Sequence, residues 1–501
     1  MKSILKCILV STLFIMLTAC SSDKNKEQEE IEKGPVIELD AMQSNALSDF
    51  DLVFLQLNND KTNKVYSPIS IKYALGMLLE GANGESYKQI ADVLGTYTFK
   101  KYKNSNNVSF ANALFVNEKH DVLKETYKES LQTKFNAAVE VGDFSTPSLV
   151  NNWVSDKTFN LIKQIVEDIS NNDFVLVNAL AIDMDWKKVI NPISFDDAYR
   201  VSYPHIRFYN YVDALEGGGY HLFDFTNDET KRIGGLQIAA TINKYDIVTI
   251  LGEENIRQEV GEAYDEWISD GACGLEDYES TQEYLDHYIK EIDSSYGDLS
   301  SSTDFEFYDD ETVKMFAKDL KVYDELELQY IGIMPKTTSL ENFIAETNAD
   351  EINTLISKLR KIDYDEFETG YITRITGGIP LFKYDYELNL VKELQSLGII
   401  DVFDETKADL SNLSEQKEFI DSATHKTTIE FSNEGITAAA VATLGGMGAD
   451  GCYFEYMYEP KIIDIDLTFN KPFVYLIRDK KSNEVWFIGE VYQPSDMEVE
   501  Y

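Results

Sequence analysis

The chain has 501 residues, of which 44% are hydrophobic and 12% aromatic, so it can build a sizeable apolar core and is not disordered throughout. Lysine and arginine total 45 against 88 aspartates and glutamates, which gives a formal net charge of −43. This excess of acid argues against a phosphate backbone as the main partner, and we expect no nucleic-acid binding.

The first twenty residues have the pattern of a bacterial secretory leader. Two lysines precede an apolar run over residues 7–17, which is too short to cross a membrane as a helix. Residues 17–20, Leu-Thr-Ala-Cys, resemble the lipobox at which a leader is cut before a cysteine that then carries lipid. We therefore expect residues 1–19 to be removed and Cys20 to be a lipid anchor. The alternative is an ordinary cleaved leader with a spare cysteine.

Residues 20–36 are charged and poor in core-forming side chains, which is typical of a flexible tether. We expect a bacterial outer-membrane lipoprotein that is exposed on the cell surface, with the periplasmic face as the alternative. Two further cysteines, Cys273 and Cys452, remain in the mature chain. They are either free thiols or one disulfide, because a single pair is no disulfide framework.

The body of the chain begins with mixed helical and strand patterns over residues 37–195. Residues 70–82 have apolar side chains at helical spacing, and residues 174–182 form an apolar run of buried-strand length. The pattern changes over residues 196–310, where the last sixty residues contain 19 acids and 2 bases. We predict an acidic insertion there, whose role the sequence leaves open.

A regular pattern returns over residues 311–495 and is rich in strands. The clearest candidates are residues 462–469, 472–479 and 485–494. With the helices of the first part, these segments predict an α+β fold.

The usual catalytic motifs are absent from the sequence. None of the five histidines lies in an HExxH motif, there is no GxSxG or GxxxxGK[ST] motif, and no GxGxxG motif follows a predicted strand. Residues 293–298 lack the alternating acids of an EF-hand loop. We therefore expect no metal, no cofactor and no enzymatic activity, and we expect the acidic insertion to be a solvated face.

The segment 431–451 differs from the rest of the chain because no residue from Gly435 to Ala449 is charged. With a period of two residues, either of its faces could enter a sheet without burying a charge. The segment is therefore compatible with both exposure and insertion as a strand. A small-residue helix or a plain surface loop is the alternative.

Several blocks of the chain, in the same order, resemble the serpin family of protease inhibitors. The segment NKVYSPISIKYALGMLLEGANGESYKQIADVLG at 63–95 is the strongest, followed by ATHKTTIEFSNEGITAAA at 423–440. The other similar blocks are 111–118, 127–145, 150–166, 176–187, 397–414 and 469–494. The acidic region and residues 449–469 fall outside the resemblance.

The resemblance implies a serpin fold of three β-sheets with about nine helices and an exposed reactive-centre loop at about 433–468. It implies that a protease cuts this loop, which then inserts into the central sheet and traps the enzyme. The matching hinge residues are Glu434, Gly435, Ile436, Thr437, Ala438, Ala439 and Ala440. Those of the shutter beneath the sheet are Ser67, Ser70, Asn178 and His425, and Trp186 matches the breach where the loop enters.

Two residues of the hinge region depart from the family pattern, which usually has threonine or serine at Ile436 and alanine at Val441. Both are uncharged, so insertion should survive, although more slowly. The family's hinge length places the cleaved bond at Ala449-Asp450. Counting back from Phe469 instead gives residues 459–461, so the loop is longer than usual.

The bond between Ala449 and Asp450 suits an elastase-like pocket. The larger side chains between the two positions suit a chymotrypsin-like or papain-like pocket. These alternates are Tyr453, Phe454, Tyr456, Met457 and, at the far end, Lys461.

The sequence thus predicts a monomeric suicide-substrate inhibitor of serine or cysteine endopeptidases, attached to a membrane by lipid. A non-inhibitory serpin that acts as a binding or scaffold lipoprotein is the first alternative. An enzyme or glycan-binding lipoprotein built through the acidic insertion is the second.

Overall fold

The computed structural model describes residues 9–21, 37, 39–119, 123–187, 201–203, 206–208, 235–237, 252–270, 278–296, 305–361, 371–431, 454 and 461–494. Within these residues the chain is α+β, as predicted, with two six-stranded sheets and ten α-helices. None of the helices in this part of the chain combines the length and apolarity needed to cross a membrane.

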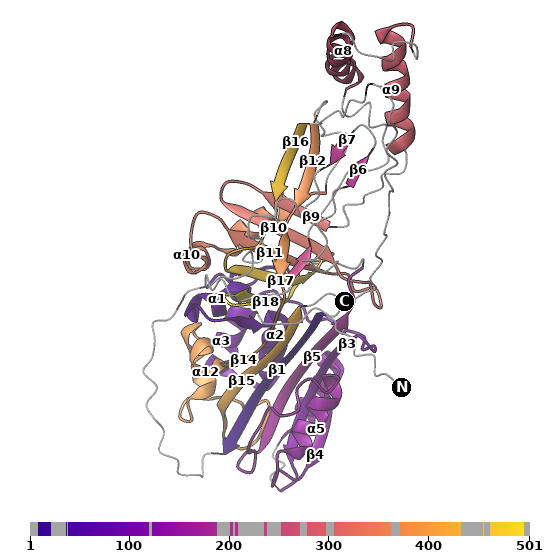
Figure 1. Ribbon diagram of the computed structural model, residues 1–501. Coiled ribbons are helices and arrows are strands. Elements are labelled where there is room, and N and C mark those ends of the chain that lie inside the picture. The colour runs from indigo at the N-terminus through magenta and orange to yellow at the C-terminus, as the bar shows by residue number, and fades with distance from the viewer. Residues whose placement is uncertain are drawn as a thin grey trace, which may run out of the picture.

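The central sheet has the strand order β14-β15-β1-β5-β3-β4 (Figure 1). Its strands are β1 (Leu9–Ser21), β3 (Val108–Asn117), β4 (Ala138–Gly142), β5 (Phe174–Met184), β14 (Phe382–Asn389) and β15 (Glu418–Phe431). The expected strand at 174–182 is confirmed as β5. It reads as a continuous apolar run because side chains from both of its faces are buried.

The second sheet is antiparallel and has the order β2-β18-β17-β11-β10-β9. Its strands are β2 (Lys64–Tyr66), β9 (Phe305–Asp309), β10 (Val313–Asp319), β11 (Leu328–Pro335), β17 (Phe473–Asp479) and β18 (Val485–Val491). The predicted strands near the C-terminus are thus confirmed.

Short two-stranded pairs complete the strands. The parallel pair is β12 (Tyr371–Thr376) with β16 (Lys461–Asp466). The antiparallel pairs are β13 (Gly378–Pro380) with β8 (Gly235–Gln237), and β6 (Val201–Tyr203) with β7 (Ile206–Phe208).

The helix expected over 70–82 is α2 (Pro68–Gly81), which packs against both large sheets. Ser67 is its N-cap and accepts a hydrogen bond from the Ser70 backbone N–H, while Pro68 takes the first helical position. The other helices are α1 (Asp49–Leu57), α3 (Gly84–Leu94), α4 (Glu125–Phe135), α5 (Ser148–Lys157), α8 (Glu253–Ser269), α9 (Thr281–Tyr296), α10 (Leu340–Glu346), α11 (Ala349–Ser357) and α12 (Leu390–Ser396), with a short 3₁₀ helix at Asp401–Phe403.

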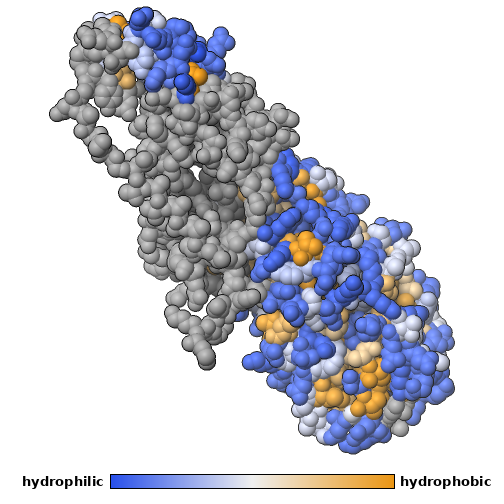
Figure 2. All heavy atoms as spheres, turned by 90° about the vertical axis from the view of Figure 1, so that its right-hand side faces the viewer, coloured by the Kyte–Doolittle hydropathy of each residue, from blue (hydrophilic) through white to orange (hydrophobic). Residues whose placement is uncertain are grey.

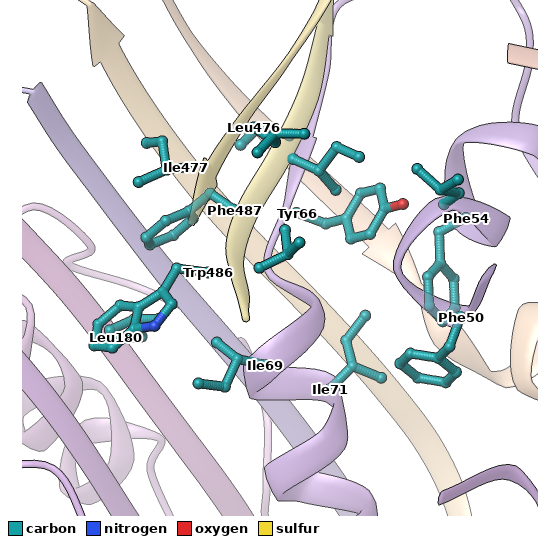
Figure 3. Close-up of a cluster of buried hydrophobic side chains, with 14 of the residues drawn as sticks. Phe50, Phe54, Tyr66, Ile69, Ile71, Leu180, Leu476, Ile477, Trp486 and Phe487 are labelled. Atoms are coloured by element: carbon teal, nitrogen blue, oxygen red, sulfur yellow. The ribbon is translucent and has the colours of Figure 1, made fainter. Parts of the chain in front are cut away.

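The main core lies where α2 and the two large sheets meet. Figure 3 shows Trp486 and Phe487 of β18, Ile69 of α2 and Leu180 of β5 gathered there, and all four are at most 1% exposed. A smaller cluster, which includes Phe115 and Val150, lies between α5 and strands β3 and β5. The central sheet is therefore covered on both faces.

The boundary of the acidic insertion differs from the predicted range 196–310. Strand β9 at its end pairs with β10 and belongs to the second sheet, with Phe305 and Phe307 buried. The acidic part outside the sheets contains α8 and α9, which form a helical hairpin at the end of the molecule remote from the central sheet (Figure 1). Its outward surface is mostly hydrophilic (Figure 2).

Candidate functional site

The central sheet holds one strand between β15 and β5, and this strand is β1. It pairs antiparallel with both neighbours along its length, with a register shift between Thr18 and Ala19 on the β15 side. The place between β5 and β15 therefore takes an extended segment of thirteen residues. A strand there satisfies the backbone groups of both neighbours.

The occupant of this place belongs to the segment that we expect, from its sequence pattern, to be a removed leader. Cys20 and Ser21, which we expected in the tether, are its last two residues and lie opposite Phe419 and Glu418. Removal of residues 1–19 would take away nearly all of β1. It would leave the facing edges of β5 and β15 without their present partner. We refer to the place between β5 and β15 as the strand slot.

The predicted shutter residues Ser67, Ser70 and His425 lie together beneath the strand slot, and all are fully buried. The backbone N–H of Ser67 donates to His425 Nε2 over 3.2 Å, and the two serine Oγ atoms are 3.5 Å apart. Thr427 Oγ1 lies 3.1 Å from the same His425 nitrogen. Nε2 therefore accepts hydrogen bonds, so the proton of the neutral ring is on Nδ1.

Asn178, the fourth predicted shutter residue, lies on the other side of the slot in β5. Its amide donates to Asn112 Oδ1 over 2.7 Å, and the Asn112 amide donates to the Phe135 carbonyl over 2.8 Å. The sequence analysis missed Asn112 and Thr427. An asparagine in a strand that is otherwise almost wholly apolar is the signal that would have found Asn112.

The two halves of the shutter are separated by β1, because Ile15 lies opposite both His425 and Asn178. His425 Nδ1 and Asn178 Oδ1 are buried and have no hydrogen-bond partner among the residues that the structure describes. His425 Nδ1–H is a donor and Asn178 Oδ1 is an acceptor, so the two groups could form a hydrogen bond with each other if they were close enough.

Burial alone lowers the pKa of His425 from its usual 6.5 to about 3. The ring is therefore neutral at physiological pH. It acts as a polar group of the core, and no carboxylate holds it in the charged form.

The predicted breach residue Trp186 lies just beyond the end of β5. Its ring is 5.5 Å from the ring of Phe431 and 6.0 Å from that of Tyr330, both nearly perpendicular. Phe431 is the last residue of β15 and stacks on Phe382 at 4.8 Å. An aromatic group thus closes the sheet three residues before the predicted hinge begins at Glu434.

The hinge residues 434–440, the bond Ala449-Asp450 and the alternates Tyr453, Tyr456 and Met457 lie outside the described residues. Lys461 is described and begins β16, opposite Tyr371. Phe454 is the one described residue between Phe431 and Lys461.

The described part of the chain contains no group of three or more histidine, cysteine, aspartate or glutamate side chains that could hold a metal ion. The candidate site of the described part is instead the strand slot of the central sheet, which β1 occupies in this structure.

The model of the family described as "Serpin (serine protease inhibitor)" matches residues 46–198 and 294–494, together more than half of the chain. The region left unmatched, 199–293, is shorter than the acidic insertion that we predicted at 196–310. It contains α8 and most of α9.

Curated relatives match over nearly their whole length. Human neuroserpin is 24% identical, over 88% of this chain and 89% of its own. Human serpin B3 is 24% identical, over 89% and 97%. An uncharacterized serpin-like protein of Methanosarcina acetivorans is 23% identical, over 99% of both chains.

Solved structures agree on the fold. The thermophilic serpin tengpin in its native state matches with a TM-score of 0.55 and 20% identity, over 95% of this chain and 100% of its own. Uncleaved ovalbumin matches with a TM-score of 0.55 and 16% identity, over 91% and 100%. The predicted serpin fold is therefore confirmed, and the chain belongs to the serpin family.

Proposed function

We propose that the mature chain is a suicide-substrate inhibitor of serine endopeptidases, with cysteine endopeptidases as a second target class. A target protease cuts the reactive-centre loop and remains attached as an acyl-enzyme. The freed loop then enters the strand slot and carries the protease with it. Membership of the serpin family supports an inhibitor and not a catalyst.

The observation that carries this proposal is the strand slot itself. An apolar segment of thirteen residues from elsewhere in the chain lies in it, and its residues 10–19 are paired on both sides. The neutral stretch 435–449 is slightly longer and also carries no charge. It could therefore replace β1 without burying a charge.

The floor of the slot explains why neutrality matters. His425, Asn178 and Thr427 are fully buried along it. An unpaired charge brought among them would lose its hydration, at a cost of several kcal/mol. A charged residue on the entering strand would thus stall insertion.

The proposal also places the chain on a membrane. Removal of residues 1–19 would empty the strand slot. Lipid attached to Cys20 during the same processing would hold the chain at the membrane. The chain would then be a monomeric body held by the lipid on Cys20 at the outer surface of a bacterial outer membrane, as the pattern of residues 1–36 favours for the anchor. Labelling with a fatty-acid probe, compared between the natural chain and Cys20→Ser, tests the anchor.

The test of inhibition mixes the chain that begins at Cys20, prepared without lipid, with elastase, chymotrypsin, subtilisin and papain. We expect an adduct stable in SDS with at least one of them, and a released C-terminal fragment whose first residue identifies the cleaved bond. The double substitution Ala438→Arg/Ala439→Arg is the control. One of two successive strand residues faces the core, so this variant should be cut without forming an adduct.

The alternative, a non-inhibitory serpin, is favoured by Ile436, where inhibitory members usually carry threonine or serine. It predicts cleavage without an adduct for the natural chain as well. If all four proteases stay active in the presence of the chain and none forms an adduct with it, the proposed inhibition is overturned.

A further inference from the structure

The acidic hairpin of α8 and α9 is a built unit and not a loose loop. Arg257 of α8 forms an ion pair with Asp286 of α9 at 2.8 Å. The Thr281 hydroxyl donates to Asp265 over 2.5 Å. Gly261 lets the helices approach closely, because a Cβ placed there would lie 3.3 Å from Leu285.

Aromatic side chains line the inner side of this hairpin. Tyr264 and Tyr284, one from each helix, are stacked with ring centroids 4.2 Å apart and planes 7° apart. Tyr278 packs edge-on against Tyr284 at 5.3 Å. Tyr264 and Tyr284 are nearly buried, in contrast to the charged side chains on the outer face.

Phe454 completes this aromatic group from far along the chain. Its ring lies 5.2 Å from Tyr264, 5.3 Å from Trp267 and 5.4 Å from Tyr284. The contacts to the two tyrosines are edge-to-face, the geometry that aromatic pairs favour. All but the last three residues of the hairpin lie outside the family match, yet the hairpin holds a residue of the predicted reactive-centre loop.

This contact bears on which bond a protease can reach. A protease must draw the residue before the cleaved bond into a pocket of its own. The half-buried Phe454 side chain packs against three rings of the hairpin, and it would have to leave them to enter the pocket of a protease. The residues around Phe454 are those that would suit a chymotrypsin-like pocket.

We propose that the α8–α9 hairpin is a specificity clamp, which holds the Phe454 side chain and so withholds it from the attacking protease. The protease is thereby directed to the small residues upstream, at Ala449-Asp450. Four residues lie between Ala449 and Phe454, so their Cα atoms are at most about 18 Å apart when the chain is extended. This inference deepens the proposed inhibition, on which its biological meaning rests.

Limited proteolysis of the full chain with chymotrypsin tests the clamp. The readout is the rate at which the C-terminal fragment beginning at Glu455 appears, followed by mass spectrometry. We expect slow cleavage of the natural chain and cleavage at least about tenfold faster in Tyr264→Ala/Trp267→Ala, because the clamp no longer holds the ring. The exposed Gln282→Ala on α9 is the matched control and should behave like the natural chain.

A second variant leaves the hairpin untouched. In Phe454→Ala the segment loses its anchor, so chymotrypsin should cut after Tyr453 or Tyr456 faster than it does in the natural chain. Equal rates at residues 453–457 in the natural chain and in both variants would overturn the clamp.

Neither measurement requires an adduct. If the natural chain is protected at Phe454 but traps no protease, the clamp stands and the proposed inhibition fails. If it traps a protease but is cut freely at Phe454, the clamp fails and inhibition stands.

Discussion

His425 of β15 and Asn178 of β5 lie opposite the same residue, Ile15 of β1, so one strand separates a buried donor and a buried acceptor that find no partner within the described part of the chain. Residues directly opposite one another project from the same face of a sheet. With β1 between them, the backbones of β5 and β15 are about 10 Å apart, and without it about 5 Å. Closure of the sheet would bring the two side chains within hydrogen-bonding reach.

The first prediction concerns this pair. We expect Asn178→Ala to destabilise the chain that begins at Cys20 by about 1–2 kcal/mol more than it destabilises the full chain, because only the closed sheet has the His425 bond to lose. Urea unfolding of both chains with and without the substitution gives the comparison. The loss of the Asn112 bond is common to both chains and cancels. Equal losses would show that the two residues never pair.

The second prediction concerns acid. Because the folded chain lowers the pKa of His425 to about 3, the unfolded chain binds a proton there first as the pH falls below about 6.5. The contribution of His425 to stability is therefore complete above pH 6.5 and is lost toward pH 3. We expect the free energy of unfolding of His425→Gln to fall less between pH 7.5 and pH 4 than that of the natural chain. Parallel pH profiles would contradict this account.

The third prediction has the opposite sign. Glu418 is buried at the start of β15, and burial with the nearby Asp173 raises its pKa from 4.5 to about 7. The unfolded chain releases this proton at lower pH, so stability is lost as the pH rises from about 4.5 to 7. We expect Glu418→Gln to stabilise the protein by about 1–3 kcal/mol at pH 8 and to have little effect at pH 4.

Glu415, three residues earlier and exposed, provides the matched control. Thermal unfolding of Glu415→Gln should change little with pH relative to the natural chain. A gain from Glu418→Gln that is the same at both pH values would show that ionisation is not its cause.

The fourth prediction compares two lysines. Lys72 of α2 pairs with Asp51 of α1 at 2.5 Å, and both side chains are fully buried. Lys88 of α3 pairs with Asp92 at 2.6 Å on the surface. We expect Lys72→Met to cost about 3–5 kcal/mol, because it removes the cation from the buried Asp51 carboxylate and leaves only the hydrogen bonds from Ser48. Lys88→Met should change the free energy of unfolding little, because the pair is exposed to solvent, and equal losses for the two variants in urea unfolding would refute this difference.

The sequence predicts the sheets better than it predicts what lies between them. Strands such as β5 and β17 are visible because buried runs of apolar residues leave a local pattern. The shutter residues came from the resemblance to a family, since no local pattern marks a serine or a histidine as part of a buried cluster. The occupant of the strand slot could not be predicted from the sequence. Its backbone pairs with β5 and β15, and these two strands come together only when the sheet folds.

Two errors of interpretation have a common physical cause. The high charge of residues 251–310 concealed the alternation of Phe305 and Phe307 that forms β9. It also concealed the aromatic residues of the hairpin, although Tyr284 and Tyr288 have the helical spacing of a packed face. The contact with Phe454 joins segments too distant in the chain for any sequence pattern to reveal.

The most direct test of the account is the melting temperature of the chain that begins at Cys20, before and after a protease cuts its reactive-centre loop. If the freed segment enters the strand slot, the cut chain should melt at a much higher temperature than the intact one, because it gains a fully paired strand in the central sheet. The Ala438→Arg/Ala439→Arg variant should show no such rise. A cut natural chain that melts at or below the temperature of the intact chain would contradict loop insertion, and with it the proposed mechanism.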